Sequence, residues 1–84
     1  MNFEDIIGLS DRMVKKIIKD IDIETVSTAM KGADMEIKEK VEKNLGKRAL
    51  KTYQELLAQL KKLSSSEIKK SREIIAEQLR KHSK

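Results

Sequence analysis

The sequence predicts an all-α fold: a compact array of six helices, four short and two longer, with right-handed superhelical or orthogonal packing. The 84 residues include no proline and only three glycines, so little in the chain would interrupt a helix. Apolar residues recur at spacings of three and four, which places them on one face of each helix. Helices this short fit a compact array better than a parallel bundle, which favours helices of similar length.

The first two predicted helices are residues 2–9 and residues 11–21. Glu4 and Asp5 lie in the first turn of the former, where acids complement the helix dipole. Ser10 is a suitable N-cap for the second helix. The apolar residues of the two segments are Phe3, Ile6, Ile7 and Leu9, then Met13, Val14, Ile17, Ile18 and Ile21.

Two further short helices are predicted over residues 23–30 and 35–45. Asp22 and Asp34 are their predicted N-caps, and Gly32 fits a left-handed C-terminal cap after the first of them. The expected inward side chains are Ile23, Val26, Ala29 and Met30 in one helix, and Ile37, Val41 and Leu45 in the other.

The longest two-faced pattern covers residues 44–63 and predicts one long helix after Gly46. Its apolar stripe consists of Leu45, Ala49, Tyr53, Leu56, Leu57, Leu60 and Leu63. The opposite face consists of Lys47, Arg48, Lys51, Gln54, Glu55, Gln59, Lys61 and Lys62. This mostly positive face is the best functional candidate in the chain, although a solvated helix face explains each charge taken alone.

The last predicted helix follows the sequence Ser64 to Glu67, which is typical of a capping box. Its inward residues are Ile68, Ile75 and Leu79, with Ile74 at the margin, and its end, RKHSK, is expected to fray. All six helices are expected to belong to one domain, residues 1–84.

The composition argues against an enzyme, a cofactor and a metal site. There is no cysteine, the single histidine is His82, and no glycine-rich phosphate loop or nucleophile motif occurs. The acids lie at predicted helix boundaries, where capping explains them. No apolar run approaches the roughly 20 residues that span a bilayer, and no signal peptide is visible, so a cytoplasmic location is expected.

The net charge of +5 leaves a nucleic acid, an anionic membrane surface or an acidic protein as the partner. Only two aromatic residues occur, Phe3 and Tyr53, and Tyr53 lies on the apolar stripe, so no stacking platform for single strands is visible.

Several phrases in order resemble a known family. The stretches FEDIIGLSDRMVKKIIKDID and AMKGADMEIKEKVEKNLGKRA are similar to the C-terminal domain of the flagellar motor switch protein FliG. That family typically reads F-E-D, then L-D-D-R, then A-L-K-G-A and K-N-M-S-K-R-A. The resemblance continues into the last helix and covers essentially all 84 residues. It also suggests that the start at Met1 lies near a domain boundary.

The resemblance implies a six-helix fold at the rim of the cytoplasmic C-ring, at the inner-membrane face in the flagellar basal body. There the domain would contact the cytoplasmic loop of the stator protein MotA, transmit torque through opposed charges and set the direction of rotation. Other rotor proteins would bind through the rest of FliG, and no small-molecule substrate is implied. Lys31, Arg48 and Glu55 stand at positions that the family uses for the stator contact, and Lys47 and Lys51 extend the row.

Two departures from the family pattern leave the function open. Leu56 replaces the second acid of an acidic pair, and Ser64 replaces a basic residue after the long helix. Lys61, Lys62 and Leu63 replace a G-P-V turn, which predicts a longer helix. If Leu56 is buried, the loss of the acid is a neutral change, and if Leu56 is exposed, its presence indicates a different partner. The alternatives are a FliG-like paralogue with an assembly or regulatory role and no torque generation, and a small basic nucleic-acid-binding domain.

Overall fold

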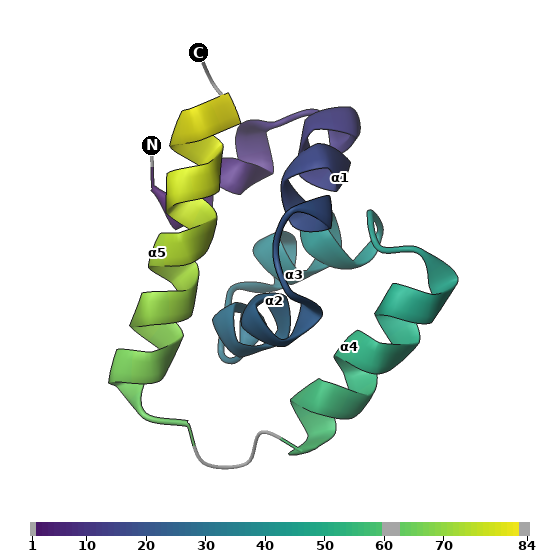
Figure 1. Ribbon diagram of the computed structural model, residues 1–84, viewed down its shortest axis with the longest axis vertical. Coiled ribbons are helices and arrows are strands. Elements are labelled where there is room, and N and C mark those ends of the chain that lie inside the picture. The colour runs from purple at the N-terminus through teal and green to yellow at the C-terminus, as the bar shows by residue number, and fades with distance from the viewer. Residues whose placement is uncertain (1, 60–62, 83–84) are drawn as a thin grey trace.

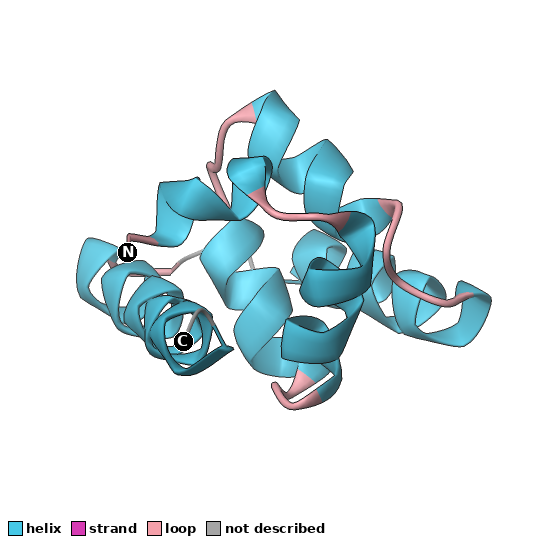
Figure 2. Ribbon diagram, turned by 90° about the horizontal axis from the view of Figure 1, so that it is seen from above, coloured by secondary structure: helices cyan, strands magenta, loops and turns pink. Residues whose placement is uncertain are grey.

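The computed structural model describes residues 2–59 and 63–82, and within them the chain forms six helices (Figure 1). Helices and loops account for this part of the chain, without a strand (Figure 2). The elements in order are the 3-10 helix η1 (Phe3–Gly8), α1 (Asp11–Lys19), α2 (Ile23–Met30), α3 (Met35–Glu42), α4 (Lys47–Gln59) and α5 (Ser65–His82). Four are short and two are longer, which confirms the predicted all-α class and its six helices.

Helix α2 lies at the centre of the array, with α5 along one side and α4 along the other (Figure 1). Its sequence IETVSTAM is mostly apolar or small, so it can be covered on several sides. Val26, Ala29 and Met30 are almost fully buried. The other helices close the core around it, η1 packing on α3 and α5, and α1 packing on α3 and α5.

The buried apolar side chains form one cluster to which all six helices contribute. Its members are Phe3, Ile6, Val14, Ile17, Val26, Ala29, Met30, Ile37, Val41, Tyr53, Ile75 and Leu79. The radius of gyration of the Cα atoms is 11.7 Å, close to the roughly 12 Å expected of a compact chain of this length.

Some predicted caps make the expected contacts. The backbone N–H of Met13 donates to Ser10 Oγ at 3.2 Å, and Gly32 has φ +72°, the left-handed conformation that favours glycine. Asp22 and Asp34 do directly precede α2 and α3, but neither side chain accepts a capping hydrogen bond. For those two residues the predicted position is right and the predicted contact is wrong.

Among the four short helices, one helix type and two helix ends differ from the prediction. The first element is a 3-10 helix, and α1 ends at Lys19 because Asp20 and Ile21 close tighter i to i+3 turns. Helix α3 ends at Glu42, three residues early. The side-chain amide of Asn44 donates to the Lys40 carbonyl at 2.7 Å and so takes a carbonyl that a continuing helix would use.

The two longer helices also differ in extent from the prediction. Helix α4 begins at Lys47, after Gly46, and is described to Gln59. Leu60, Lys61 and Lys62 lie outside the described residues, and Leu63 is not helical. Helix α5 continues through Arg80 to His82, so this part of the expected frayed end is helical, and Ser83 and Lys84 lie outside the described residues. His82 Nε2 lies 3.6 Å from Asp20 Oδ2, which links the end of α5 to the residue that follows α1.

The buried side of α4 is rotated from the predicted stripe. Tyr53 is fully buried, and Leu50 and Leu57 pack against the core cluster with it. Ala49 and Leu56, which the stripe included, are half-buried and do not belong to the packed set. Because α4 rests mainly on α2, only the side that faces α2 is covered.

Candidate functional site

The exposed side of α4 carries a charged row made of Lys47, Arg48, Lys51 and Glu55. All four are exposed. Lys47, Lys51 and Glu55 recur every four residues, and Arg48 stands three residues before Lys51, so the row follows one side of the helix. The structure therefore brings these four predicted residues together. Three cations and one acid on a single surface can pair with a partner that presents mainly acids and one base.

The charged row is held in place by Tyr53 on the opposite side of α4. The Tyr53 hydroxyl donates to Glu42 Oε2 at 2.7 Å, which connects α4 to the end of α3. Burial raises the pKa of Tyr53 well above its usual value, and the hydrogen bond to Glu42 raises it further. The hydroxyl thus stays protonated, and α4 cannot rotate without breaking this bond.

Lys31 lies apart from the charged row. It follows the last residue of α2 and lines a surface hollow of about 650 Å³ whose walls come from η1, the end of α2 and α5. No residue of α4 lines this hollow. The five predicted residues therefore fall into two places, the α4 row and the Lys31 hollow.

Arg72, which was not among the residues predicted from the sequence, fixes the backbone at Lys31. Arg72 Nε donates to the Ala29 carbonyl at 2.9 Å, and Nη2 donates to the Lys31 carbonyl at 3.0 Å. Its guanidinium also lies 5.2 Å from the centroid of the Phe3 ring. The signal was the spacing: Arg72 stands between Ile68 and Ile75 on the inward side of α5. A cationic side chain on the inward side of a helix indicates a hydrogen-bond acceptor inside the fold.

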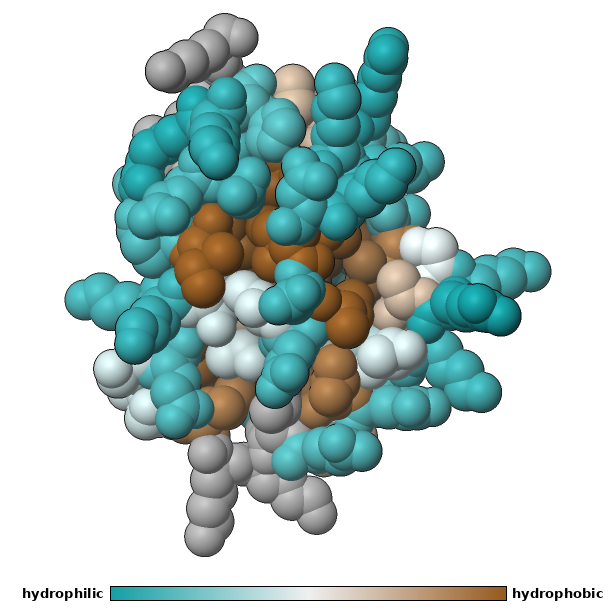
Figure 3. All heavy atoms as spheres, in the orientation of Figure 1, coloured by the Kyte–Doolittle hydropathy of each residue, from teal (hydrophilic) through white to brown (hydrophobic). Residues whose placement is uncertain are grey.

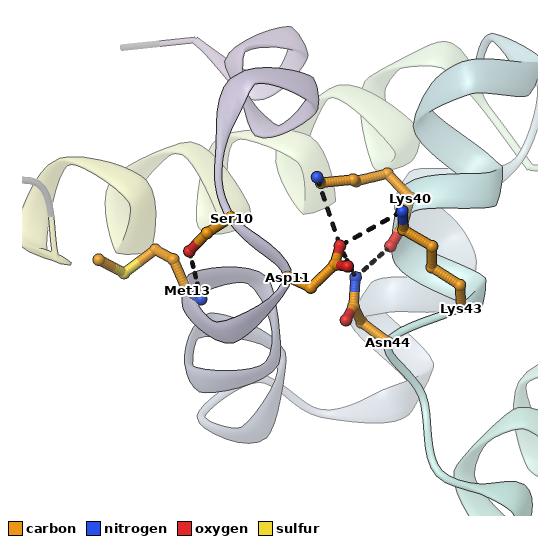
Figure 4. Close-up of polar contacts among 6 residues, drawn as sticks. All are labelled: Ser10, Asp11, Met13, Lys40, Lys43 and Asn44. Atoms are coloured by element: carbon orange, nitrogen blue, oxygen red, sulfur yellow. Dashed lines mark hydrogen bonds and ion pairs between the residues drawn. The ribbon is translucent and has the colours of Figure 1, made fainter.

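A polar cluster apart from the charged row joins the start of α1 to the end of α3 (Figure 4). Asp11 Oδ1 accepts a hydrogen bond from Asn44 Nδ2 at 3.1 Å and lies 3.4 Å from the Nζ atoms of Lys40 and Lys43. The hydrogen bond from Asn44 lowers the pKa of Asp11, the two lysines lower it further, and partial desolvation opposes them. This cluster connects two helices through Asp11 Oδ1, which a structural role explains.

The two departures from the family pattern differ in their surroundings. Leu56 is half-buried and lies outside the core cluster. Ser64 directly precedes α5, and its Oγ accepts the backbone N–H of Glu67 at 3.2 Å, the first half of the predicted capping box. Ser64 therefore has a structural use in this chain, whereas Leu56 has no comparable packing role.

Within residues 2–59 and 63–82, no helix is long and apolar enough to cross a membrane. The same residues contain no group of three or more histidine, aspartate or glutamate side chains that could hold a metal ion.

Comparison with known proteins gives consistent results for sequence and fold. A family model of the FliG C-terminal domain matches residues 1–84. The flagellar motor switch protein FliG of Aquifex aeolicus is 39% identical over 79 residues, which are 94% of this chain and 24% of that protein. The chain thus spans about a quarter of the length of this relative.

Solved structures extend the comparison. The structure of full-length FliG from Aquifex aeolicus superposes with a TM-score of 0.90 at 38% identity, over 96% of this chain and 25% of that one. A crystal structure of FliG from H. pylori gives a TM-score of 0.89 at 23% identity, over 96% of this chain and 38% of that one. The second similarity supports the fold.

Proposed function

This chain belongs to the FliG C-terminal domain family, and from that membership we propose that it is a flagellar rotor domain that contacts the cytoplasmic loop of the stator protein MotA. The relatives are flagellar motor switch proteins, which supports a rotor role. The observation that carries the stator contact is the exposed row on α4, Lys47, Arg48, Lys51 and Glu55.

The row suits a contact that forms and breaks repeatedly. An exposed ion pair contributes about 0 to 1 kcal/mol, and its field is screened over about 8 to 10 Å at physiological salt. Several such pairs act together only while the two surfaces are close. A passing acidic surface would therefore be attracted to Lys47, Arg48 and Lys51 and released without a large barrier, while Glu55 pairs with a base.

Lys31 makes a second, separate contact in this proposal. Its backbone is held by Arg72, so the position of the Lys31 side chain is tied to the packing of α2 on α5. A stator surface that touches both the α4 row and Lys31 would sense the orientation of the whole domain. Orientation of the domain is, in this proposal, what sets the direction of rotation.

The remaining parts of the proposal follow from the family. The domain would act without catalysis or a cofactor, at the cytoplasmic face of the inner membrane in the flagellar basal body. Contacts with other rotor proteins would be made by the remaining parts of a FliG-type protein, since this chain spans about a quarter of such relatives.

A FliG-like paralogue without torque generation is the second candidate, and the position of Leu56 favours it. The residue is half-buried, lies outside the core cluster and stands next to Glu55 where the family pattern has a second acid. The row is accordingly more positive than the family pattern.

A domain exchange separates the two candidates. The 84 residues replace the matching C-terminal domain of the switch protein in a motile host, which carries either its own MotA or the MotA from the source of this chain. Flagellar assembly and swimming are then scored. Rotating flagella support the rotor function, whereas assembled but paralysed flagella with both stators support the paralogue.

A further inference from the structure

A groove of about 320 Å³ lies between α1, the turn from α1 to α2, and the start of α4. Its apolar lining consists of Ile18, Ile21, Ile23, Leu45 and Ala49. The first four of these are only partly buried although they pack against the core, so part of each side chain faces the groove. On the face of the molecule seen in Figure 1, hydrophobic side chains gather in the middle and hydrophilic ones surround them (Figure 3).

The apolar surface continues along α4 beyond the groove. Within α4, Ala49 and Leu56 are seven residues apart, which aligns them on one side of the helix, and Leu45 lies in the turn just before α4 and lines the groove. Ala49 and Leu56 are both half-buried and unused by the core. Ala49 and Leu56 are about two helical turns apart along α4, so together with the groove they can accommodate a short helix.

The charges around the groove have one sign. Lys15 and Lys19, one helical turn apart on α1, line it, and no acid does. Other hollows of the surface are mixed: Glu4 and Glu73 line the one beside Arg72. A positive rim around an apolar floor is complementary to an apolar stripe bordered by acids.

We propose that this groove binds an amphipathic helix of a partner protein, with large aliphatic side chains in the groove and Asp or Glu side chains facing Lys15 and Lys19. Helices that dock in grooves place residues at i, i+3 or i+4, and i+7 against an apolar floor, and the groove with its continuation along α4 provides such a floor. A second copy of this chain is a poorer occupant because each copy would bring the same lysines to the contact.

This binding site goes beyond the proposed rotor function and does not depend on it. Ala49 lines the groove and Leu56 continues its apolar surface along α4, whereas the proposed stator contact uses the charged row, Lys47, Arg48, Lys51 and Glu55, on the exposed side. Changes in one set leave the other in place, so the two proposals can fail separately.

The test is an NMR titration of the ¹⁵N-labelled 84-residue chain with two designed peptides. Both peptides form helices of about three turns with the same leucine stripe. One has glutamates and the other has lysines beside that stripe. We expect the glutamate peptide to bind at least about tenfold more tightly and to shift the amide signals of Ile18, Ile21 and Ala49.

Two variants make the test specific. Ala49→Glu places a carboxylate in the groove and is expected to weaken the glutamate peptide about tenfold or more. Ala58→Glu is the matched control, because Ala58 is exposed. It follows Ala49 by nine residues, about two and a half turns, and therefore lies on the opposite side of α4. It should change the affinity less than about twofold.

Reversing the rim provides the decisive comparison. The double change Lys15→Glu and Lys19→Glu should make the lysine peptide the tighter ligand. The proposal is overturned if the glutamate peptide does not bind, if both peptides bind equally, or if the shifted signals lie away from the groove. It is also overturned if sedimentation shows that Ala49→Glu abolishes a dimer of the unmodified chain, since a second copy would then be the occupant.

Discussion

The Tyr53 hydroxyl donates a 2.7 Å hydrogen bond to Glu42 Oε2, and this contact fixes the helix that carries the charged row. Tyr53 is fully buried on the side of α4 that packs on α2, and Glu42 is the last residue of α3. The exposed charges on α4 therefore depend for their position on a buried contact on the opposite side of the same helix.

Removing that hydroxyl should destabilise the domain moderately. Tyr53→Phe keeps the ring and leaves Glu42 without its donor, which should cost about 1 to 2 kcal/mol. Tyr53→Ala also leaves a cavity and should cost about 3 to 5 kcal/mol. Urea unfolding followed by circular dichroism measures both. Equal stability of Tyr53→Phe and the parent would show that the hydrogen bond does not hold α4.

Asp11 should make stability depend on pH in the acid range. Its pKa lies below the ordinary 3.8 in the folded chain, first because of the hydrogen bond from Asn44 and then because of Lys40 and Lys43. A lowered folded pKa means that Asp11 stabilises the fold fully at pH values above its ordinary pKa, which is that of the unfolded chain. That stabilisation is lost as the pH falls through the folded value.

Thermal unfolding of the parent and Asp11→Asn between pH 2 and pH 7, roughly the span over which carboxylates titrate, tests this. The parent should be more stable near neutral pH, and the difference should shrink at the acid end. Asp34→Asn is the control, because the Asp34 side chain makes no capping hydrogen bond. A difference between parent and Asp11→Asn that stays constant across the range would contradict the account.

Arg72 should stabilise the end of α2 more than the rest of the fold. Arg72→Met keeps an aliphatic chain beside Phe3 and removes both hydrogen bonds to the carbonyls of Ala29 and Lys31, at a cost of about 1 to 2 kcal/mol. Hydrogen exchange should show faster exchange of the amides around Lys31. Lys70→Met, on the exposed side of α5, should change stability by less than about 0.5 kcal/mol.

Restoring a charged residue at each of the two departures from the family pattern, Leu56 and Ser64, should change the stability of the domain by different amounts. Leu56→Asp should change stability by less than about 1 kcal/mol, because Leu56 is half-buried and outside the core cluster. Ser64→Arg should cost about 1 kcal/mol, because Ser64 Oγ caps the start of α5. Thermal unfolding compares them, and a larger loss for Leu56→Asp would show that the core uses Leu56 after all.

The sequence predicts local features of this fold well. Spacings of three and four identify the six helices, and Ser10 and Gly32 mark boundaries that the structure confirms. Such features depend on residues within one or two turns of each other. The exposed row on α4 was predictable for the same reason, since the helical period alone places Lys47, Lys51 and Glu55 on one side.

Features that depend on distant residues were not predictable. Asn44 ends α3 early through contacts that include Asp11, 33 residues away, and Arg72 holds carbonyls 41 and 43 residues away. The apolar stripe of α4 is wider than the surface that α2 covers. Only the packing of α4 on α2 decides that Leu50 is used and Leu56 is not.

The central claim, that the α4 row contacts the stator, is tested most directly by the rotation of single motors that carry this domain in the motile chimera. Arg48→Glu should leave flagella assembled and reduce or stop rotation, because it reverses a charge at an exposed position. Arg12→Glu, the same change at an exposed position on α1, should rotate at the parent speed. Parent-like rotation of Arg48→Glu motors would contradict the account.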